Sequence, residues 1–317
     1  MRKTVVVPIA FLFLAIPMFA ATKVCIDPGH GGPDPGNSYN GIVEKDATLD
    51  IARLLRFWMQ QDTADTNGGG GTWGIVMTRD SDIDPGLARR PIIANEAGAD
   101  RFVSIHLNAA TNTTACGTET YCQEGLSDSS LSCIFRGHIH DQLIAGLKLI
   151  DRGKKKKNLQ VLRDAQMPAA LSEGGFLSCA SDAAVFKNST KKTEAALSHL
   201  FGLQMHYSIT PYVPTLTLTN QTMTPVSASQ GWWRHYKINV PSGQRTLTIT
   251  LSGGTGDGDL YVRRGNQPTT STYGSRSRNA NNEESIQILS PQSGDWYIGV
   301  YGSKDFSATS CKARYSS

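Results

Sequence analysis

The sequence has little excess charge. Its 317 residues include 31 lysines and arginines against 27 aspartates and glutamates, which gives a net charge of +4. Two of the positive charges, Arg2 and Lys3, lie in an amino-terminal segment that we expect to be removed, which lowers the net charge to +2. Such a small charge argues against nucleic acid as a partner.

Two familiar site patterns are also absent. None of the six cysteines has Cys-x-x-Cys spacing, which disfavours a zinc site built from cysteines. The glycine-rich run at residues 27–32 lacks the Gly-Lys-Ser/Thr ending of a phosphate-binding loop, so we reject that interpretation. The remaining candidates for chemistry are histidines and carboxylates.

The amino terminus resembles an export signal. Basic residues precede an apolar run from Val5 to Ala20, which is interrupted by Pro8 and Pro17 and is too short for a comfortable membrane span. Small residues follow, so residues 1–21 are predicted to be a secretory signal. An uncleaved membrane anchor is the alternative.

Four short runs far apart in the chain carry reactive side chains. They are residues 27–32 with His30, 41–45 with Glu44, 104–108 with His106, and 172–176 with Glu173. Zinc favours nitrogen and oxygen donors, and a hydrolytic site uses three protein ligands so that a fourth position can hold water. Two histidines and a carboxylate form such a set, and a second carboxylate can serve as its base. Taken singly, each histidine could also be an ordinary turn or strand-end residue.

The expected secondary structure supports this grouping. Three apolar segments, 23–27, 101–105 and 168–172, are predicted strands, and each leads into one of the reactive residues. Glu44 precedes a stretch with apolar residues at helical spacing, which places it near a helix start. Ligands of open α/β sheets bind outside the carboxyl ends of the strands, so the four runs can converge there.

These runs resemble the type 3 family of zinc-dependent N-acetylmuramoyl-L-alanine amidases, which cut peptidoglycan between its glycan and its stem peptide. The resemblance covers about residues 22 to 207 and includes further matches in the family's order. Those matches are residues 76–80, Arg89 with Ala94 and Asn95, residues 99–100, 117–121 and 161–163, and Pro168. The resemblance implies an α/β domain with a single mostly parallel sheet flanked by helices. His30, Glu44 and His106 are then the ligands of one Zn2+ ion, and Glu173 is the catalytic carboxylate.

Two more residues are candidates for substrate binding, Asn108 and Arg163. The guanidinium of Arg163 is permanently charged and could make a two-pronged contact with a substrate carboxylate. A surface ion pair is an equally good interpretation. The basic run at residues 154–157 likewise has two interpretations, a solvated turn before a strand at 159–161, or attraction for stem-peptide carboxylates.

A change in composition after Tyr207 separates the catalytic domain, residues 22–208, from a second one. Residues 209–230 contain three prolines and many threonines with almost no charge, which predicts an exposed, extended linker. Residues 231–317 show period-two alternation in short segments between turns, which predicts a small all-β sandwich.

This carboxyl-terminal part is similar to the bacterial pre-peptidase C-terminal domain. The likeness rests on residues 241–243, 256–262, 282–284 and 294–297, with Gly265 and Pro268. Such domains accompany exported hydrolases, and some help to attach the enzyme to insoluble material.

Export would expose the cysteines to oxidation. Our first expected disulfide joins Cys116 to Cys122, which flank residues 117–121. The remaining expectations are a pair of Cys25 with Cys179, and either an interdomain bridge or two free thiols at Cys133 and Cys311.

The sequence therefore predicts a periplasmic or extracellular peptidoglycan hydrolase that cleaves the amide between N-acetylmuramic acid and L-alanine. We expect a monomer that uses one zinc ion and binds no nucleic acid. The need for an activator protein is left open. The alternatives are a zinc peptidase that cuts within the stem peptide and a non-catalytic wall-binding protein.

Overall fold

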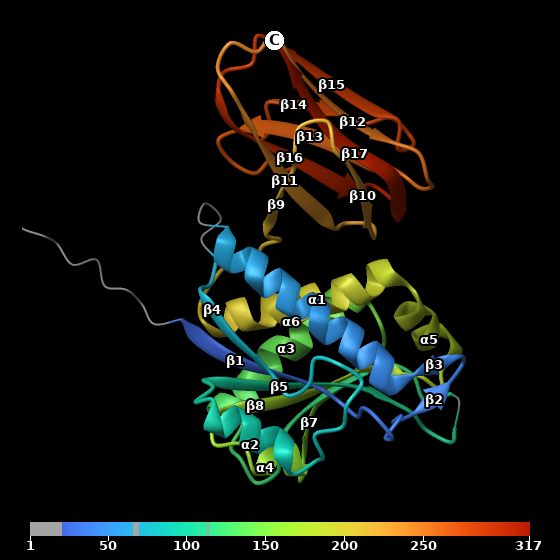
Figure 1. The fold of residues 1–317 in the computed structure, drawn as a ribbon. Coiled ribbons are helices and arrows are strands. Elements are labelled where there is room, and N and C mark those ends of the chain that lie inside the picture. The colour runs from blue at the N-terminus through green and yellow to red at the C-terminus, as the bar shows by residue number, and fades with distance from the viewer. Residues whose placement is uncertain (1–20, 66–69, 113) are drawn as a thin grey trace, which may run out of the picture.

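The computed structural model describes residues 21–317 except 66–69 and 113. The predicted export signal therefore lies outside the described residues, apart from Ala21. Within the described part of the chain, no helix combines the length and the apolar character needed to cross a membrane. The chain forms an α/β domain followed by a β-sandwich (Figure 1).

The α/β domain is built on a six-stranded sheet with the order β4-β1-β5-β8-β6-β7. The strands are β1 (Thr22–Pro28), β4 (Trp73–Met77), β5 (Arg101–Asn108), β6 (Thr118–Gln123), β7 (Asp151–Lys157) and β8 (Ala169–Phe176). All neighbours run parallel except β6 and β8, which are antiparallel. A short ribbon, β2 (Ser38–Tyr39) and β3 (Ile42–Val43), leads into the first helix. The predicted mostly parallel sheet is confirmed.

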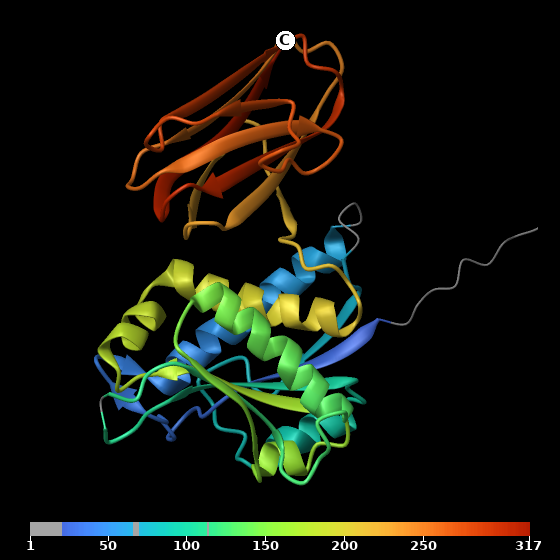
Figure 2. The same ribbon diagram turned by 180° about the vertical axis from the view of Figure 1, so that it is seen from behind.

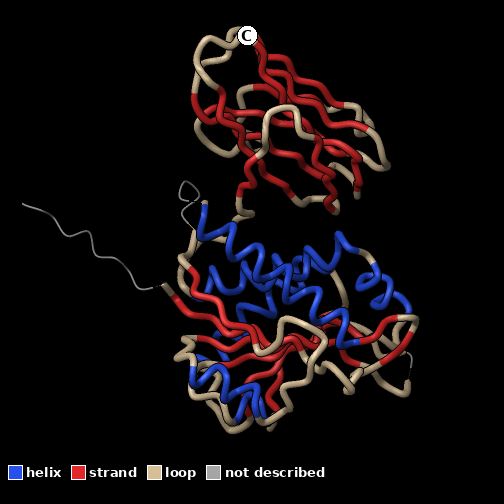
Figure 3. Tube along the Cα trace, in the orientation of Figure 1, coloured by secondary structure: helices blue, strands red, loops and turns tan. Residues whose placement is uncertain are grey.

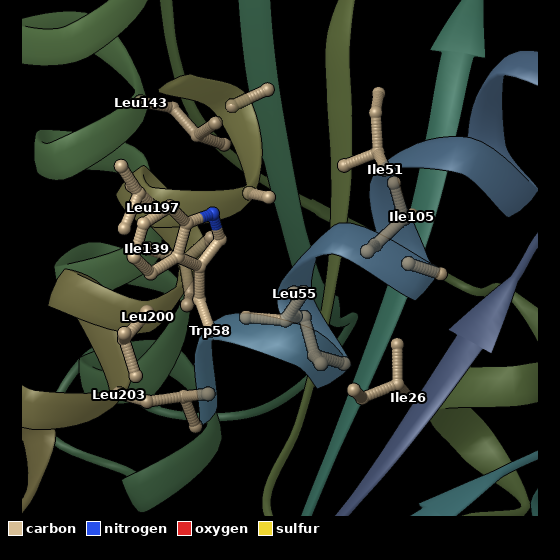
Figure 4. Packing of buried hydrophobic residues seen from close by; sticks show 14 of the residues in the cluster. Ile26, Ile51, Leu55, Trp58, Ile105, Ile139, Leu143, Leu197, Leu200 and Leu203 are labelled. Atoms are coloured by element: carbon tan, nitrogen blue, oxygen red, sulfur yellow. The ribbon is translucent and has the colours of Figure 1, made fainter. Parts of the chain in front are cut away.

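Helices flank both faces of this sheet. They are α1 (Glu44–Ala64), α2 (Arg89–Glu96), α3 (Leu131–Leu147), α4 (Gln160–Arg163), α5 (Ala180–Lys187) and α6 (Ser189–His206). The helices α1, α3 and α6 lie on the face toward the sandwich, whereas α2 and α4 lie on the other face (Figures 1 and 2). Trp58 of α1, Ile139 of α3 and Leu200 of α6 belong to one buried cluster (Figure 4). Burying an aliphatic side chain of this size contributes about 1.5–3 kcal/mol.

The basic run differs from its predicted structure. Residues 154–157 form the end of the edge strand β7 rather than a turn, and β7 pairs in parallel with β6. The predicted strand that follows is instead the short helix α4. One edge of β7 is exposed to solvent. Consecutive lysines can therefore extend their charged groups into water, while the backbone of β7 forms hydrogen bonds with β6.

The carboxyl-terminal domain is built of strands and loops (Figure 3). Its two sheets have the orders β10-β17-β12-β15 and β14-β13-β16-β11-β9. Its strands are β9 (Thr215–Thr217), β10 (Met223–Ala228), β11 (Trp233–Val240), β12 (Thr246–Ser252), β13 (Gly258–Arg264), β14 (Ser275–Ser277), β15 (Glu284–Leu289), β16 (Gly294–Gly302) and β17 (Phe306–Ser316). In β12 the inward residues Leu247, Ile249 and Leu251 are buried and alternate with threonines. The alternating pattern therefore predicted the sandwich correctly.

The expected exposed linker is wrong in two segments. Strand β9 pairs in parallel with β11, and β10 pairs with β17, so both belong to the sandwich. Threonine-rich segments favour strands, and both strands lie at sheet edges, where proline is tolerated. Pro225 falls where the β10–β17 register shifts, which removes the need for a ladder hydrogen bond from its nitrogen.

The expected disulfides are also wrong. The bonds join Cys116 to Cys179 and Cys122 to Cys133, while Cys25 and Cys311 are free and buried. Cys116 precedes β6 and Cys122 lies near its end, and the extended strand between them, at roughly 3.3 Å per residue, separates the two cysteines beyond the reach of a disulfide. The sheet order instead brings β6 next to β8, and Cys179 follows β8.

Candidate active site

His30, Glu44, His106 and Glu173 come together at one edge of the sheet. His106 and Glu173 lie on the neighbouring strands β5 and β8 and are partners in register. This register shifts between His106 and Asn108, and such irregularities often occur beside active sites. His30 follows β1, the other neighbour of β5, and Glu44 is the first residue of α1. The structure therefore brings all four residues together.

Glu44 lies at the centre of a triad with the two histidines. Its Oε1 is 3.0 Å from Nδ1 of His106 and 3.2 Å from Nε2 of His30. The side chain is 1% exposed, and Oε2 accepts hydrogen bonds from the backbone and side-chain nitrogens of Asn37. Although burial opposes ionisation, hydrogen bonds from His106 and His30 hold the pKa of Glu44 well below its usual range. Glu44 is therefore a carboxylate at neutral pH.

The donor set of this triad fits a zinc ion. One ligand atom from each of His30, Glu44 and His106 lies within 4.8 Å of the other two. Imidazole nitrogens and a carboxylate oxygen are the donors of catalytic zinc sites. Asp34 Oδ2 lies 2.7 Å from Nδ1 of His30, which orients the ring and leaves Nε2 toward Glu44. These residues suit the metal that the family resemblance implies.

Two buried arginines fix the loop that carries His30. His30 has a positive φ of 61°, which is uncommon for a residue with a side chain. Arg90 donates a hydrogen bond to its carbonyl at 2.6 Å, and Arg79 donates to the Gly29 carbonyl at 2.8 Å. Gly29 must lack a side chain, because a Cβ there would lie 2.2 Å from the His106 ring. The surrounding hydrogen bonds therefore hold His30 in its unusual backbone conformation.

Arg89 belongs to the motif that resembles the family, but its neighbour Arg90, which was not predicted, is the buried residue at the site. Arg89 is exposed and pairs with Glu96 at the surface. Arg90 is 3% exposed, and its Nη1 lies 2.8 Å from a carboxylate oxygen of the buried Asp27. Arg90 and the buried Ala94 are four residues apart, so they share the inner face of α2. Helical spacing was the signal that could have identified Arg90.

Glu173 has a different environment from Glu44. Its Oε2 is buried and has no hydrogen-bond partner among the described residues. Burial, followed by the negative charges of Glu44 and Glu119, raises the pKa of Glu173 well above its ordinary value. Such a carboxyl group is free to exchange a proton with a bound molecule. The two glutamates are therefore suited to separate tasks, metal binding and proton transfer.

A pocket of about 440 Å³ lies beside these residues. Its lining consists of His30, Asp34, Asp84, Leu87, Arg90, His106, Asn108, Tyr121, Lys157, Leu159, Gln160, Val161, Leu171 and Glu173. The lining is mostly polar and charged, with Leu87, Leu159, Val161 and Leu171 as its aliphatic part, and the volume falls in the size range of small-molecule sites. His30, His106 and Glu173 are all accessible from it.

Glu119, next to Glu173 in the β6–β8 register, organises one wall of the pocket. It is 3% exposed and accepts hydrogen bonds from Asn108 Nδ2 at 2.8 Å, Tyr121 Oη at 2.6 Å, Arg152 Nε at 2.9 Å, and Lys155 Nζ. Burial opposes the charge of Glu119, but these hydrogen bonds, that of Lys155 foremost, lower its pKa. Glu119 lies in the segment 117–121 that resembles the family, but its contacts depend on the pairing of β6 with β8, which the sequence pattern does not contain.

The two predicted substrate-binding residues differ in position. Asn108 lines the pocket, but its amide nitrogen donates to Glu119 and its oxygen accepts from the backbone of Ala109. Arg163 is 48% exposed, is not part of the pocket lining, and bonds to Asp164 and Asn158. Arg163 therefore has the surface pairing that was the alternative interpretation.

A second group of possible metal donors lies at Cys116, Cys179 and Asp182. The two cysteines are joined in a disulfide, so their sulfurs are not thiolate ligands. Asp182 accepts hydrogen bonds from the backbone nitrogens of Gly117 and Phe176. This group is therefore a structural crosslink.

Comparisons with known families agree with this geometry. Residues 24–204 match the family model described as N-acetylmuramoyl-L-alanine amidase. Residues 234–302 match the bacterial pre-peptidase C-terminal domain.

Individual relatives support the same assignment. The sporulation-specific N-acetylmuramoyl-L-alanine amidase of Bacillus subtilis (strain 168) is 38% identical over 187 residues, which cover 59% of this chain and 69% of the relative. The crystal structure of N-acetylmuramoyl-L-alanine amidase from Clostridium difficile 630 has a TM-score of 0.54 at 33% identity and covers 59% of this chain and 97% of its own. The CwlD amidase from Clostridioides difficile, solved in complex with the GerS lipoprotein, has a TM-score of 0.53 at 26% identity and covers 59% and 98%. The chain therefore belongs to the N-acetylmuramoyl-L-alanine amidase family of enzymes and carries a bacterial pre-peptidase C-terminal domain after its α/β domain.

Proposed function

We propose that this chain is a secreted, zinc-dependent enzyme that hydrolyses the amide between the lactyl group of N-acetylmuramic acid and L-alanine in peptidoglycan. One observation carries the proposal: His30, His106 and Glu173, whose Oε2 has no partner among the described residues, line one pocket, and Glu44 completes a metal-donor group with the two histidines. Family membership supports the substrate class and the bond that is cut.

The division of tasks follows from the surroundings of each residue. His30, Glu44 and His106 would hold the zinc ion, with Asp34 orienting the ring of His30. Zinc in such a site lowers the pKa of a coordinated water to about 7 and polarises a carbonyl under attack. The charged Glu44 offsets part of the positive charge that the site must accommodate.

Glu173 performs the proton transfers in this proposal. As a carboxylate it takes a proton from the attacking water, and it then passes that proton to the nitrogen of the departing L-alanine. Its burial supports this role, because burial raises the pKa of Glu173 toward neutral pH. A carboxyl group with such a pKa can both accept and release a proton at that pH. No other side chain hydrogen-bonds to its Oε2 among the described residues.

The proposed location is outside the cytoplasmic membrane, in the periplasm or the extracellular space. The two disulfides support this location, because disulfides persist in oxidising compartments. The export signal at residues 1–21 remains a sequence-based prediction.

Digestion of purified peptidoglycan by the zinc-loaded chain tests the proposal, with mass spectrometry of the products. We expect glycan strands free of peptide, together with stem peptides that have a new L-alanine amino terminus. Shortened stems still attached to muramic acid would contradict the proposal and indicate a peptidase.

An unchanged polymer would support a wall-binding protein or the need for an activator. Because the related CwlD was solved with the GerS lipoprotein, the second reading is checked by repeating the digestion in extract from the source organism. A zinc-loaded chain that is inactive in both settings would contradict the proposed enzyme activity.

A further inference from the structure

We propose that Lys157 is a specificity-determining residue that binds the α-carboxylate of the stem residue after L-alanine. This inference rests on the proposed function, since it concerns how the same pocket holds its substrate. It assigns a role to one lysine of the basic run at residues 154–157. The sequence alone does not distinguish the four lysines of this run from one another.

The four lysines of residues 154–157 are not equivalent. Three of them are paired with acids of the same domain: Lys154 with Asp141, Lys155 with Glu119, and Lys156 with Asp128. Lys157 lines the pocket and has no ion pair within the described residues. The other arginine or lysine in the lining, Arg90, already pairs with Asp27 and Asp84. Lys157 is therefore the positive group of the lining that remains available to a ligand.

The position of Lys157 is well defined. It is the last residue of β7, and its carbonyl accepts a hydrogen bond from the backbone nitrogen of Leu159 at 2.9 Å. Its ammonium lies 5.8 Å from the centre of the Tyr121 ring, within the range of a cation–π contact. Tyr121 is itself fixed, because its hydroxyl donates to Glu119 at 2.6 Å. The lysine thus rests on a supported aromatic surface at the pocket wall.

The charge around the pocket is asymmetric. On the side of β6 and β7, Arg152 and Lys155 both pair with Glu119, and Lys157 adds a further positive charge at the pocket lining, so positive charge is in excess there. The loops after β1 and β4 instead contribute the acidic residues Asp34 and Asp84. An anionic group of the substrate is therefore attracted toward the β7 side.

The stem peptide of peptidoglycan contains a carboxylate that could pair with Lys157. The stem residue that follows L-alanine carries an α-carboxylate when it is D-isoglutamate and is neutral there when it is amidated. This is the carboxylate nearest to the scissile amide along the stem. A pocket of about 440 Å³ is large enough for more than the amide itself, so the next residue can reach the wall.

Lys157 could also act indirectly, because its positive charge lowers the pKa of Glu173. An indirect effect through Glu173 would change the binding and cleavage of both stems equally. A direct contact instead favours the stem with the charged α-carboxylate over the amidated one. Substituting Glu173 by glutamine removes the carboxyl group on which the indirect route depends. Binding measured in that background therefore isolates the direct contact.

The experiment uses the zinc-loaded full chain carrying Glu173→Gln and two muramoyl tripeptides ending in L-lysine amide. The tripeptides differ only in a free or an amidated α-carboxyl on the second residue. We expect calorimetry to show about fivefold tighter binding of the charged stem, the upper range for one partly exposed ion pair. Adding Lys157→Met should abolish this preference, and Lys157→Arg should restore it. The matched control Lys156→Met, which removes a lysine paired outside the pocket, should leave the preference intact.

Equal affinities for the two stems in the protein that retains Lys157 would overturn the inference, as would a preference that survives Lys157→Met. Failure of both stems to bind would also count against it. Hydrolysis of the same stems by the zinc-loaded wild-type chain is measured in parallel. If wild type cleaves neither stem, alone or in extract from the source organism, while the binding preference holds, the proposed function is wrong and the carboxylate site stands.

Discussion

The two domains surround their buried acidic side chains with different groups. In the α/β domain, Glu44 faces two imidazole rings, and Glu173 next to them has an oxygen without a partner. In the sandwich, Glu284 is also buried, but it accepts hydrogen bonds from the hydroxyl of Ser277 and the backbone nitrogen of Asn279. Asp257 of the sandwich is buried with an unpartnered Oδ1, like Glu173, but it belongs to no group of possible metal donors within the described residues. Burial of a carboxyl group is therefore not by itself evidence of a reactive site.

The comparison extends to the possible metal donors. Within the described ranges, groups of three or more histidine, cysteine or carboxylate donors occur in the α/β domain and not in the sandwich. The strands of the α/β sheet end beside loops from distant parts of the sequence, whereas most sandwich strands follow one another through short loops, the connection at residues 265–274 being longer. Convergence of separate segments, rather than acidity, distinguishes the candidate site.

The largest expected effect on stability concerns Arg90, which supports the loop that carries His30. Arg90→Met removes the cation paired with the buried Asp27, and we expect a loss of about 3–5 kcal/mol in the free energy of unfolding of the α/β domain. Its neighbour provides a matched control, because Arg89→Met breaks an exposed pair with Glu96 and should cost less than about 1 kcal/mol. Denaturant titration of both variants measures the difference. Equal losses would show that the structure misassigns the buried partner.

A smaller effect, dependent on pH, is expected in the sandwich. Burial and the charge of Arg234 lower the pKa of His235 to about 3, whereas an unfolded chain binds this proton near pH 6.5. The unfolded state therefore binds more protons between these values, so stability is complete above about pH 6.5 and falls as the pH is lowered. We expect His235 to account for a loss of about 2 kcal/mol between pH 7 and pH 5.

The rings of Trp233 and His235 are stacked, with their centroids 5.2 Å apart. Unfolding can therefore be measured by the change in Trp233 fluorescence. Other buried histidines, such as His199, also lower stability in acid. The difference in pH dependence between wild type and His235→Gln therefore isolates the contribution of His235. If both proteins lose the same stability between pH 7 and pH 5, His235 is not buried in its neutral form.

The reactive residues could be predicted because their signals are local. His30 follows β1, and His106 and Glu173 lie toward the carboxyl ends of β5 and β8, so the rule for strand ends together with the family resemblance grouped them. The sandwich could also be predicted from the sequence, because the alternation of buried and exposed side chains along a strand depends on neighbouring residues alone.

The errors concern features that depend on which strands are neighbours. The partner of Cys116 is set by the adjacency of β6 and β8, which no local pattern encodes. Segments such as β9 and β10 have the threonine and proline content of a linker, and only their pairing with β11 and β17 makes them strands. The network around Glu119 likewise depends on three neighbouring segments.

The central claim is that His30, Glu44 and His106 hold zinc while Glu173 transfers the proton. Metal analysis and turnover of peptidoglycan, measured on the same sample of Glu173→Gln, test it most directly. We expect one zinc ion per chain, as in wild type, and a fall in kcat of roughly 10²- to 10⁴-fold, the usual contribution of a general acid–base group. His30→Ala is the control and should lose both zinc and activity. A Glu173→Gln chain that keeps wild-type turnover, or that loses its zinc, would contradict the account.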